Sequence, residues 1–186
     1  MPTRRTTLAA ISSASIPFVA GCLGNLPPGG SEFEDDWPTI PDSPESYPII
    51  QPGDRSFDSF YEMEFETREL GTEDDYYRPH AIKVGNVGGV SGIDVGIIDT
   101  LAEEVMFKGR HTPPDGTGVK FRLLTPAQYI VKVRVPESDY QHTVRVMCST
   151  FDCNASSTQI GVFDDDDIAS SNTSLGAICG RGTFTC

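Results

Sequence analysis

The run Asp164-Asp165-Asp166-Asp167 is the densest group of potential metal ligands in the 186-residue sequence. Calcium ions in proteins bind about six to eight oxygen atoms, and carboxylates supply many of them. Adjacent side chains of an extended chain point to opposite sides, so this run does not converge on one ion without a turn. We therefore favour a solvated acidic loop, with a Ca²⁺ site at these residues as the alternative. The sequence indicates no other cofactor.

Asp94 and Asp99 are the carboxylates that a hydrolase could use as acid and base. Their odd separation places them on opposite faces of a predicted strand, which opposes joint action on one substrate. The histidines at positions 80, 111 and 142 all precede Cys148, so the ligand order of a blue-copper site does not occur. We therefore predict that the protein is not an enzyme, and a secreted hydrolase is the weakest alternative.

The cysteines beyond the N-terminal region lie together near the C-terminus, at Cys148, Cys153, Cys179 and Cys186. An even number of cysteines in an exported protein predicts disulfides. Four cysteines allow three pairings, and the sequence does not choose among them. A zinc site is the alternative, but the gaps between neighbouring cysteines are wider than the usual zinc spacing.

Two Asn-X-Ser/Thr patterns, at Asn154 and Asn172, are candidate acceptors for N-linked sugar. Both lie in polar, loop-like stretches of the sequence. An exported domain presents such loops on its surface, where sugar can be attached, and the sequence leaves open whether either site is occupied.

The N-terminal residues predict where the protein works. Arg4 and Arg5 precede a weakly apolar stretch, and Val19-Ala20-Gly21-Cys22 follows it. The paired arginines resemble the twin-arginine export signal. The second pattern resembles a lipobox, in which the cysteine thiol takes a lipid. The resemblance implies a signal peptide at residues 1–21, a lipid on Cys22 and a location on the extracellular face of the cell membrane.

The composition is strongly acidic, with 14 Lys and Arg against 27 Asp and Glu. The net charge is −13, and removal of residues 1–21 leaves −15. This balance argues against nucleic acid as a partner, because phosphate binding needs a basic surface. At about 1 M salt the screening length falls to about 3 Å, so such a chain no longer repels itself strongly. An acidic twin-arginine lipoprotein resembles the secreted lipoproteins of halophilic archaea.

Residues 22–55 predict a disordered tether between the lipid and the rest of the chain. They contain half of the 14 prolines together with seven acidic residues. Proline stiffens a chain and like charges extend it, so this segment has no expected fold. Docking of Trp37 and of the Tyr47-Pro48-Ile49-Ile50 stretch onto the domain is the open alternative. At about 3.1 Å per residue it would reach on the order of 100 Å from the lipid.

Residues 56–186 show the alternation of apolar and polar residues that is typical of half-buried strands. Seven segments carry this pattern, around Met63, Lys83, Val95, Phe121, Val133, Val146 and Ile160, and Phe184 marks a candidate eighth strand. Residues 101–108 favour a short helix. Short strands separated by turns predict an all-β fold, an antiparallel β-sandwich of the jelly-roll or immunoglobulin-like type with seven or eight strands.

Two of these segments resemble a known domain family. Residues 92–99 place Asp94 after the first apolar residue of a strand, and the stretch Leu124-Thr125-Pro126-Ala127-Gln128-Tyr129 leads into another strand. Both resemble the paired strands of the prepeptidase C-terminal type of β-sandwich, with Thr125 inserted and Gln128 in place of the usual glycine. The resemblance implies an accessory module of secreted proteins that serves binding or solubility.

Together these features predict a non-enzymatic cell-surface lipoprotein whose sandwich is a binding or structural module outside the membrane. The expected partners are the membrane, through the lipid on Cys22, and an unidentified surface protein or polysaccharide. The main alternative is a Ca²⁺-binding or solute-binding accessory protein of a membrane complex.

Overall fold

A computed structural model of the chain describes residues 36–50, 60, 62–73, 77–136, 138–164 and 166–174. These residues fall within the unit that comprises Glu34–Cys186. Outside them lie the predictions for Arg4, Arg5, Cys22, Asp165, Cys179 and Cys186 and the candidate strand around Phe184.

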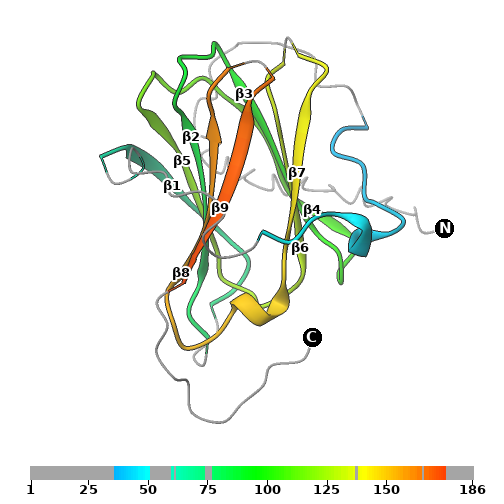
Figure 1. Cartoon of the computed structure of the whole chain (residues 1–186). Helices are drawn as coiled ribbons and strands as arrows, with labels where there is room; N and C mark the ends of the chain where they lie inside the picture. Colours follow the sequence, from blue (N-terminus) through cyan, green and yellow to red (C-terminus); the bar gives the residue numbers. More distant parts are fainter. Residues whose placement is uncertain are drawn as a thin grey trace, which may run out of the picture. The chain divides into compact units, whose positions relative to one another are not determined.

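The described residues form nine strands and two short 3₁₀ helices, so the predicted all-β fold is confirmed (Figure 1). The strands are β1 Glu64–Leu70, β2 His80–Asn86, β3 Ile93–Asp99, β4 Glu104–His111, β5 Thr117–Leu123, β6 Tyr129–Arg134, β7 Gln141–Val146, β8 Ser156–Val162 and β9 Ile168–Ser174. The 3₁₀ helices are η1 Pro44–Ser46 and η3 Cys148–Thr150.

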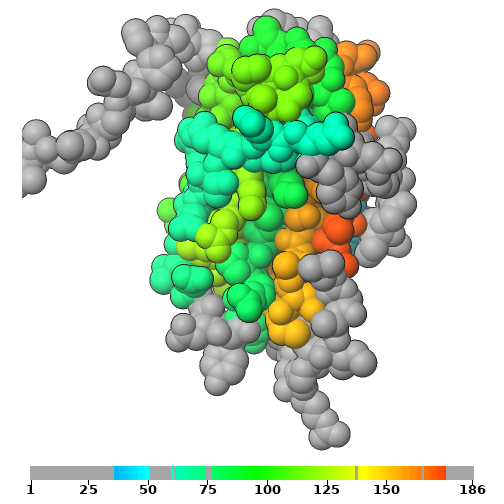
Figure 2. Space-filling model, turned by 90° about the vertical axis from the view of Figure 1, so that its left-hand side faces the viewer, coloured from blue at the N-terminus to red at the C-terminus, as the bar shows by residue number. Residues whose placement is uncertain are grey.

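The strands form two sheets that pack face to face (Figure 1). The five-stranded sheet has the order β1-β5-β2-β8-β9, and the four-stranded sheet has the order β4-β3-β6-β7. All neighbours in the four-stranded sheet are antiparallel. In the five-stranded sheet, β1 with β5 and β2 with β8 are parallel pairs. The predicted antiparallel sandwich is therefore confirmed, except that one sheet contains two parallel pairs. Figure 2 shows the molecule from the side of β1, β5 and β2.

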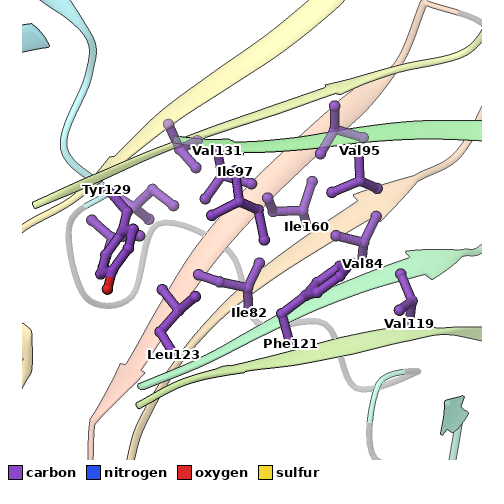
Figure 3. Close-up of a cluster of buried hydrophobic side chains, with 14 of the residues drawn as sticks. Ile82, Val84, Val95, Ile97, Val119, Phe121, Leu123, Tyr129, Val131 and Ile160 are labelled. Atoms are coloured by element: carbon purple, nitrogen blue, oxygen red, sulfur yellow. The ribbon is translucent and has the colours of Figure 1, made fainter. Parts of the chain in front are cut away.

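Alternate residues of both sheets meet in a shared apolar core (Figure 3). Ile82 and Phe121 come from the five-stranded sheet, and Ile97, Tyr129 and Val131 come from the four-stranded sheet. Each of these five side chains is fully buried. Burial of an aliphatic or aromatic side chain of this size contributes about 1.5–3 kcal/mol. The strand alternation read from the sequence therefore identifies the residues that hold the two sheets together.

The predicted helix over residues 101–108 is wrong, because this stretch is a turn followed by β4. A bulge in β4 lies opposite Ile97 and Ile98 and inserts one extra residue into the strand. As a result Met106 and Phe107, which are adjacent in the sequence, both pack against the core. Neighbouring apolar residues on one side fit a helical pattern better than a strand pattern, so the bulge concealed the strand.

The sequence pattern does not predict β9, and it places β1 too early. Ile168 is the only large apolar residue of β9, which lies at the edge of the five-stranded sheet and pairs with β8. An edge strand is held on one side by backbone hydrogen bonds, so a polar sequence can form one. β1 begins at Glu64, whereas the alternation in the sequence begins at residue 61.

Residues 36–50, which we call the strap, pack against the four-stranded sheet, so the predicted tether over residues 22–55 is wrong in this part. Trp37 is 7% exposed, and its indole N–H donates to Gln141 Oε1 at 2.7 Å. The backbone N–H of Arg145 in β7 donates to the Pro48 carbonyl at 2.9 Å. Prolines stop the strap from forming regular structure, but they leave its apolar residues able to pack. The folded domain therefore includes residues that composition assigned to the tether.

Candidate functional site

Asp94, a proposed acid or base, is enclosed by two arginines on the outer face of the four-stranded sheet. Its side chain is 0% exposed. Arg110 of β4 contacts the two carboxylate oxygens with Nε at 2.6 Å and Nη2 at 3.0 Å. Arg134 of β6 adds an Nε contact at 3.3 Å. The carboxylate thus links β3 to both neighbouring strands, and this role fully occupies it.

Asp99, the other proposed partner, caps the turn between β3 and β4. Its Oδ1 accepts the backbone N–H groups of Leu101 at 2.9 Å and Ala102 at 3.0 Å. Asp94 and Asp99 lie at opposite ends of β3, and each has its own structural partners. The structure therefore does not bring the two carboxylates together as a catalytic pair.

His80 is a buried structural histidine at the start of β2. Ser156 Oγ lies 2.8 Å from its Nδ1, and Thr158 Oγ1 lies 3.0 Å from its Nε2. Because the Ser156 hydroxyl already donates to the Thr150 carbonyl, Nδ1 donates to Ser156 and Nε2 accepts from Thr158. Burial lowers the pKa of His80 to about 4, since the charged ring would lose its hydration. The ring is therefore neutral near pH 7.

The other two histidines are partly buried and also belong to the sandwich. His142 Nε2 lies 2.9 Å from Ser170 Oγ, so this contact joins β7 of one sheet to β9 of the other. His111 stacks on Phe107 with ring centroids 5.7 Å apart. Burial lowers the pKa of both rings. Among the described residues, no hydrogen bond or ion pair joins either ring to a carboxylate, so the His142–Ser170 contact lacks the third group of a catalytic triad.

The acidic run at residues 164–167 forms the turn between β8 and β9. Asp164 Oδ1 accepts the backbone N–H groups of Asp166 at 3.1 Å and Asp167 at 2.9 Å. These bonds lower the pKa of Asp164, the one from Asp166 most strongly. Among the described residues, no group of three or more His, Cys, Asp or Glu side chains is arranged to hold a metal ion. The Ca²⁺ site stays a prediction, because Asp165 lies outside the described residues.

Cys148 and Cys153 flank the short segment that follows β7. Cys148 is buried in η3, and Cys153 is exposed in the loop before β8. Cys179 and Cys186 lie outside the described residues, so all three pairings stay open.

The two glycosylation candidates lie in different surroundings. Asn154 is 8% exposed, and its side-chain amide donates to Asp152 Oδ2 at 3.1 Å. Asn172 lies within β9, opposite Thr158 of β8, and its amide oxygen is buried. The expected loop position is therefore wrong for Asn172, and a sugar on Asn154 would have to displace its contact with Asp152. Attachment of sugar at either residue stays a prediction.

The outer face of the four-stranded sheet carries basic residues that the strap covers. Lys132 Nζ donates to the Thr39 carbonyl at 2.9 Å. The guanidinium carbon of Arg134 lies 4.6 Å from the centroid of the Trp37 ring, a cation–π distance. A Cβ atom at Gly96 would come within 2.6 Å of the Pro38 ring, so glycine allows the strap to approach the sheet. On this face each of these basic side chains contacts the chain's own residues.

The outer face of the five-stranded sheet has a row of glycines that sequence reasoning missed. Gly118, Gly85 and Gly161 are neighbours across β5, β2 and β8. A Cβ atom on Gly118 would contact Phe65, one on Gly85 would contact Met63 and Phe60, and one on Gly161 would contact Phe163. The glycines are far apart in the sequence, and only the strand register aligns them. They make a shallow row that large side chains fill from outside.

A row of hydrogen-bond donors runs beside this glycine row. Its members, in strand order from β1 to β9, are Thr67, Lys120, Lys83, Gln159 and Ser171. Thr67 is exposed and the two lysines are half-buried, whereas Gln159 and Ser171 are buried. Lys83 and Lys120, which we call the lysine pair, are directly opposite each other. The alternating strand patterns contain both lysines, but no sequence signal shows that they are neighbours.

Comparison of the chain with protein-family models and with curated protein sequences found no match. Among the described residues, no helix is both long enough and apolar enough to cross a membrane.

Proposed function

We propose that the protein is a lipid-anchored, non-enzymatic β-sandwich that binds a partner outside the cell membrane. The observation that carries this proposal is the use of Asp94, Asp99 and His80 for structural hydrogen bonds. Asp94 and Asp99 are the groups that the sequence offers for acid–base chemistry, His80 is the most buried histidine of the described residues, and each is bound by its own neighbours. A binding role leaves them in this state, whereas a hydrolase that used Asp94 and Asp99 as acid and base would need both carboxylates to face substrate.

The anchor is part of the same proposal. Arg4 and Arg5 would direct export by the twin-arginine route, and the lipid would be attached to Cys22. A chain with a net charge of −15 after removal of residues 1–21 suits a salt-rich exterior, where self-repulsion is screened. The likeness to haloarchaeal lipoproteins and to prepeptidase C-terminal sandwiches supports this location and an accessory role.

The packed strap changes the proposed reach of the domain. Thirteen residues separate Cys22 from Asp36, the first residue that the structure describes. At about 3.1 Å per residue, this segment spans at most about 45 Å when extended. The domain would therefore work closer to the membrane surface than the full tether of residues 22–55 would allow.

We also propose two disulfides among the four C-terminal cysteines, because an exported domain meets oxidising conditions. Each would stabilise the fold by about 2–4 kcal/mol through the loop that it closes. Peptide mapping of the native protein without reduction identifies the pairs, and four free thiols would refute them.

The experiment that tests the anchor follows the native protein through cell fractionation. The wild-type protein is expected in the membrane fraction, with an intact mass that lacks residues 1–21 and includes a lipid. The Cys22→Ser variant is expected to lose the lipid, and Asn25→Ala, a change close to Cys22 that leaves the lipobox intact, is the control that keeps it. A Cys22→Ser protein that stays in the membrane fraction, or a wild-type protein that retains Met1 in the cytosol, would refute the proposal.

A further inference from the structure

The lysine pair is an unfavourable arrangement for folding alone. Lys83 and Lys120 occupy directly opposite positions of the antiparallel pair β2–β5. Opposite residues of such a pair have Cβ atoms about 5 Å apart, and like charges there destabilise a sheet. Only four lysines occur in the chain, and two of them meet at this position.

The surroundings of the lysine pair leave this repulsion uncompensated. Among the described residues, no carboxylate lies within ion-pair distance of either ammonium group. Glu69 is in the neighbouring row of the same face, and it pairs with Arg122. Burial, and then the charge of Lys120, lower the pKa of Lys83. A negative group placed between the two lysines would relieve both effects.

The neighbours of the lysine pair offer further contacts to a ligand. Exposed Thr67 precedes Lys120 in the donor row and adds a hydroxyl group. Lys83 Nζ lies 5.7 Å from the centroid of the Phe65 ring, and the Phe60 ring lies 5.8 Å from that of Phe65. The face thus combines two cations, a hydroxyl and aromatic surface, over a width of three strands, or about 10 Å.

We infer that the outer face of β1, β5 and β2 binds an acidic polysaccharide, a polymer of sugars that carries carboxylate or sulfate groups. The inference rests on the proposed function, which places this face outside the cell. Anionic groups of the polymer would lie against Lys83 and Lys120, and its hydroxyl and apolar ring surfaces would contact Thr67 and Phe65. Charge complementarity selects this occupant on a molecule that is otherwise strongly acidic.

Other polyanions fit this face less well. Duplex nucleic acid carries one charge per about 1.7 Å. The lysine pair could contact only a few of these charges, and the rest of a protein of net charge −15 would repel the others. Docking on anionic lipid by charge usually needs about four to eight basic residues in a cluster. A polysaccharide has more widely spaced charges and many hydroxyl groups, so two lysines and their neutral neighbours can supply a large share of its contacts.

The test uses the mature protein in detergent and two anionic probes with widely spaced carboxylates, hyaluronate and polygalacturonate, with neutral dextran as the uncharged control. Wild-type protein is expected to bind both anionic polymers and not neutral dextran. The double variant Lys83→Gln/Lys120→Gln is expected to bind them about tenfold more weakly or worse, because two charge-assisted hydrogen bonds are lost. Lys108→Gln is the matched control, since Lys108 is an exposed lysine on β4 of the other sheet, and less than about twofold change is expected.

Several outcomes decide the inference separately from the anchor. Loss of a like-charge pair does not threaten folding, and unfolding curves of the variants verify this. No binding of either polymer by the wild type, or equal loss in Lys108→Gln, would overturn the inference. Lysine-dependent binding to vesicles of anionic lipid or to DNA with the same affinity as to the polysaccharides would also overturn it. The face would then recognise negative charge without preference for a polysaccharide. Each of these results leaves the membrane location, which cell fractionation tests, unaffected.

Discussion

Two groups of basic residues, one on the outer face of each sheet, are arranged in opposite ways. On the four-stranded sheet, Arg110 and Arg134 bind Asp94, and Lys132 donates to the backbone of the strap. On the five-stranded sheet, Lys83 and Lys120 face each other instead. The first arrangement stabilises the fold, whereas the second costs stability. A local cost that folding does not require is expected at functional sites, so the comparison directs attention to the second face.

The largest loss of stability is expected for Asp94→Ala, on the outer face of the four-stranded sheet. The change removes the buried carboxylate that Arg110 and Arg134 share, and removal of one partner of a buried ion pair costs about 3–5 kcal/mol. The free energy of unfolding in urea measures it. Asp139→Asn, at an exposed position, is the control and is expected to change stability by less than about 0.5 kcal/mol. Equal effects of the two variants would show that the carboxylate is not needed for the fold.

Acid is expected to lower the stability of the core through protonation of His80. Its folded-state pKa is about 4, below the ordinary value of 6.5, so the unfolded chain binds the proton more readily. This contribution to stability is complete above pH 6.5 and is lost as pH falls through 4, and it amounts to about 3 kcal/mol. His111 and His142 shift in the same direction. His80→Gln is expected to have a flatter stability profile between pH 6.5 and 4, and a profile parallel to that of the wild type would refute this assignment.

The strap contributes a smaller share to the stability of the outer face of the four-stranded sheet. Trp37→Ala removes the ring over Arg134 and the hydrogen bond to Gln141, and the expected loss of stability is about 2–3 kcal/mol. Ile40→Ala, at an exposed position in the strap, is the control and is expected to change stability little. Unfolding curves followed by far-ultraviolet circular dichroism, a signal that does not depend on tryptophan fluorescence, measure the stability of both variants. A neutral Trp37→Ala would mean that the strap does not stabilise the sandwich.

A change in the lysine pair, on the outer face of the five-stranded sheet, is expected to cause a small gain in stability. Lys120→Gln is expected to raise the free energy of unfolding by about 0.5 kcal/mol at low salt, because it removes the repulsion with Lys83. The gain is expected to vanish at about 1–2 M salt, where charges are screened within about 3 Å. Thermal unfolding at the two salt concentrations measures the difference. A destabilised Lys120→Gln would show that the lysine pair serves the fold.

Calcium is expected to have the smallest effect. Asp164 Oδ1 already accepts two backbone N–H groups in the β8–β9 turn, and the described residues place no three carboxylate, histidine or cysteine side chains together to hold an ion. We expect no change in melting temperature when Ca²⁺ is added or removed by a chelator, and no binding heat by calorimetry. A clear rise with Ca²⁺ that Asp164→Asn abolishes would instead support the solute-binding alternative.

Several strands could be predicted because their residues alternate without interruption. β6 is the clearest example, since Tyr129, Val131 and Val133 face the core and Lys132 faces outward. β4 was missed because its bulge turns two adjacent residues toward the core, and β9 was missed because an edge strand needs few apolar side chains. The strap was assigned to the tether because composition reports proline and charge but not what Trp37 contacts.

The candidate site depended on the register of the strands. Lys83 and Lys120 are 37 positions apart in the sequence, and they meet only because β2 and β5 pair in one register. Asp94 likewise looked available for chemistry until β4 and β6 brought two arginines to it. Sequence spacing cannot show such contacts, because a shift of one residue in pairing would move each side chain to the other face.

The sequence by itself determined the local properties of this protein. Alternation of residue type set the strands and their buried sides, because a side-chain period of two follows from strand geometry. Composition set the net charge of −13 and its dependence on salt. Only the tertiary structure decided which charges are paired and which are opposed, and that the strap belongs to the domain. These outcomes depend on contacts between distant residues, and such contacts form only when the two sheets assemble.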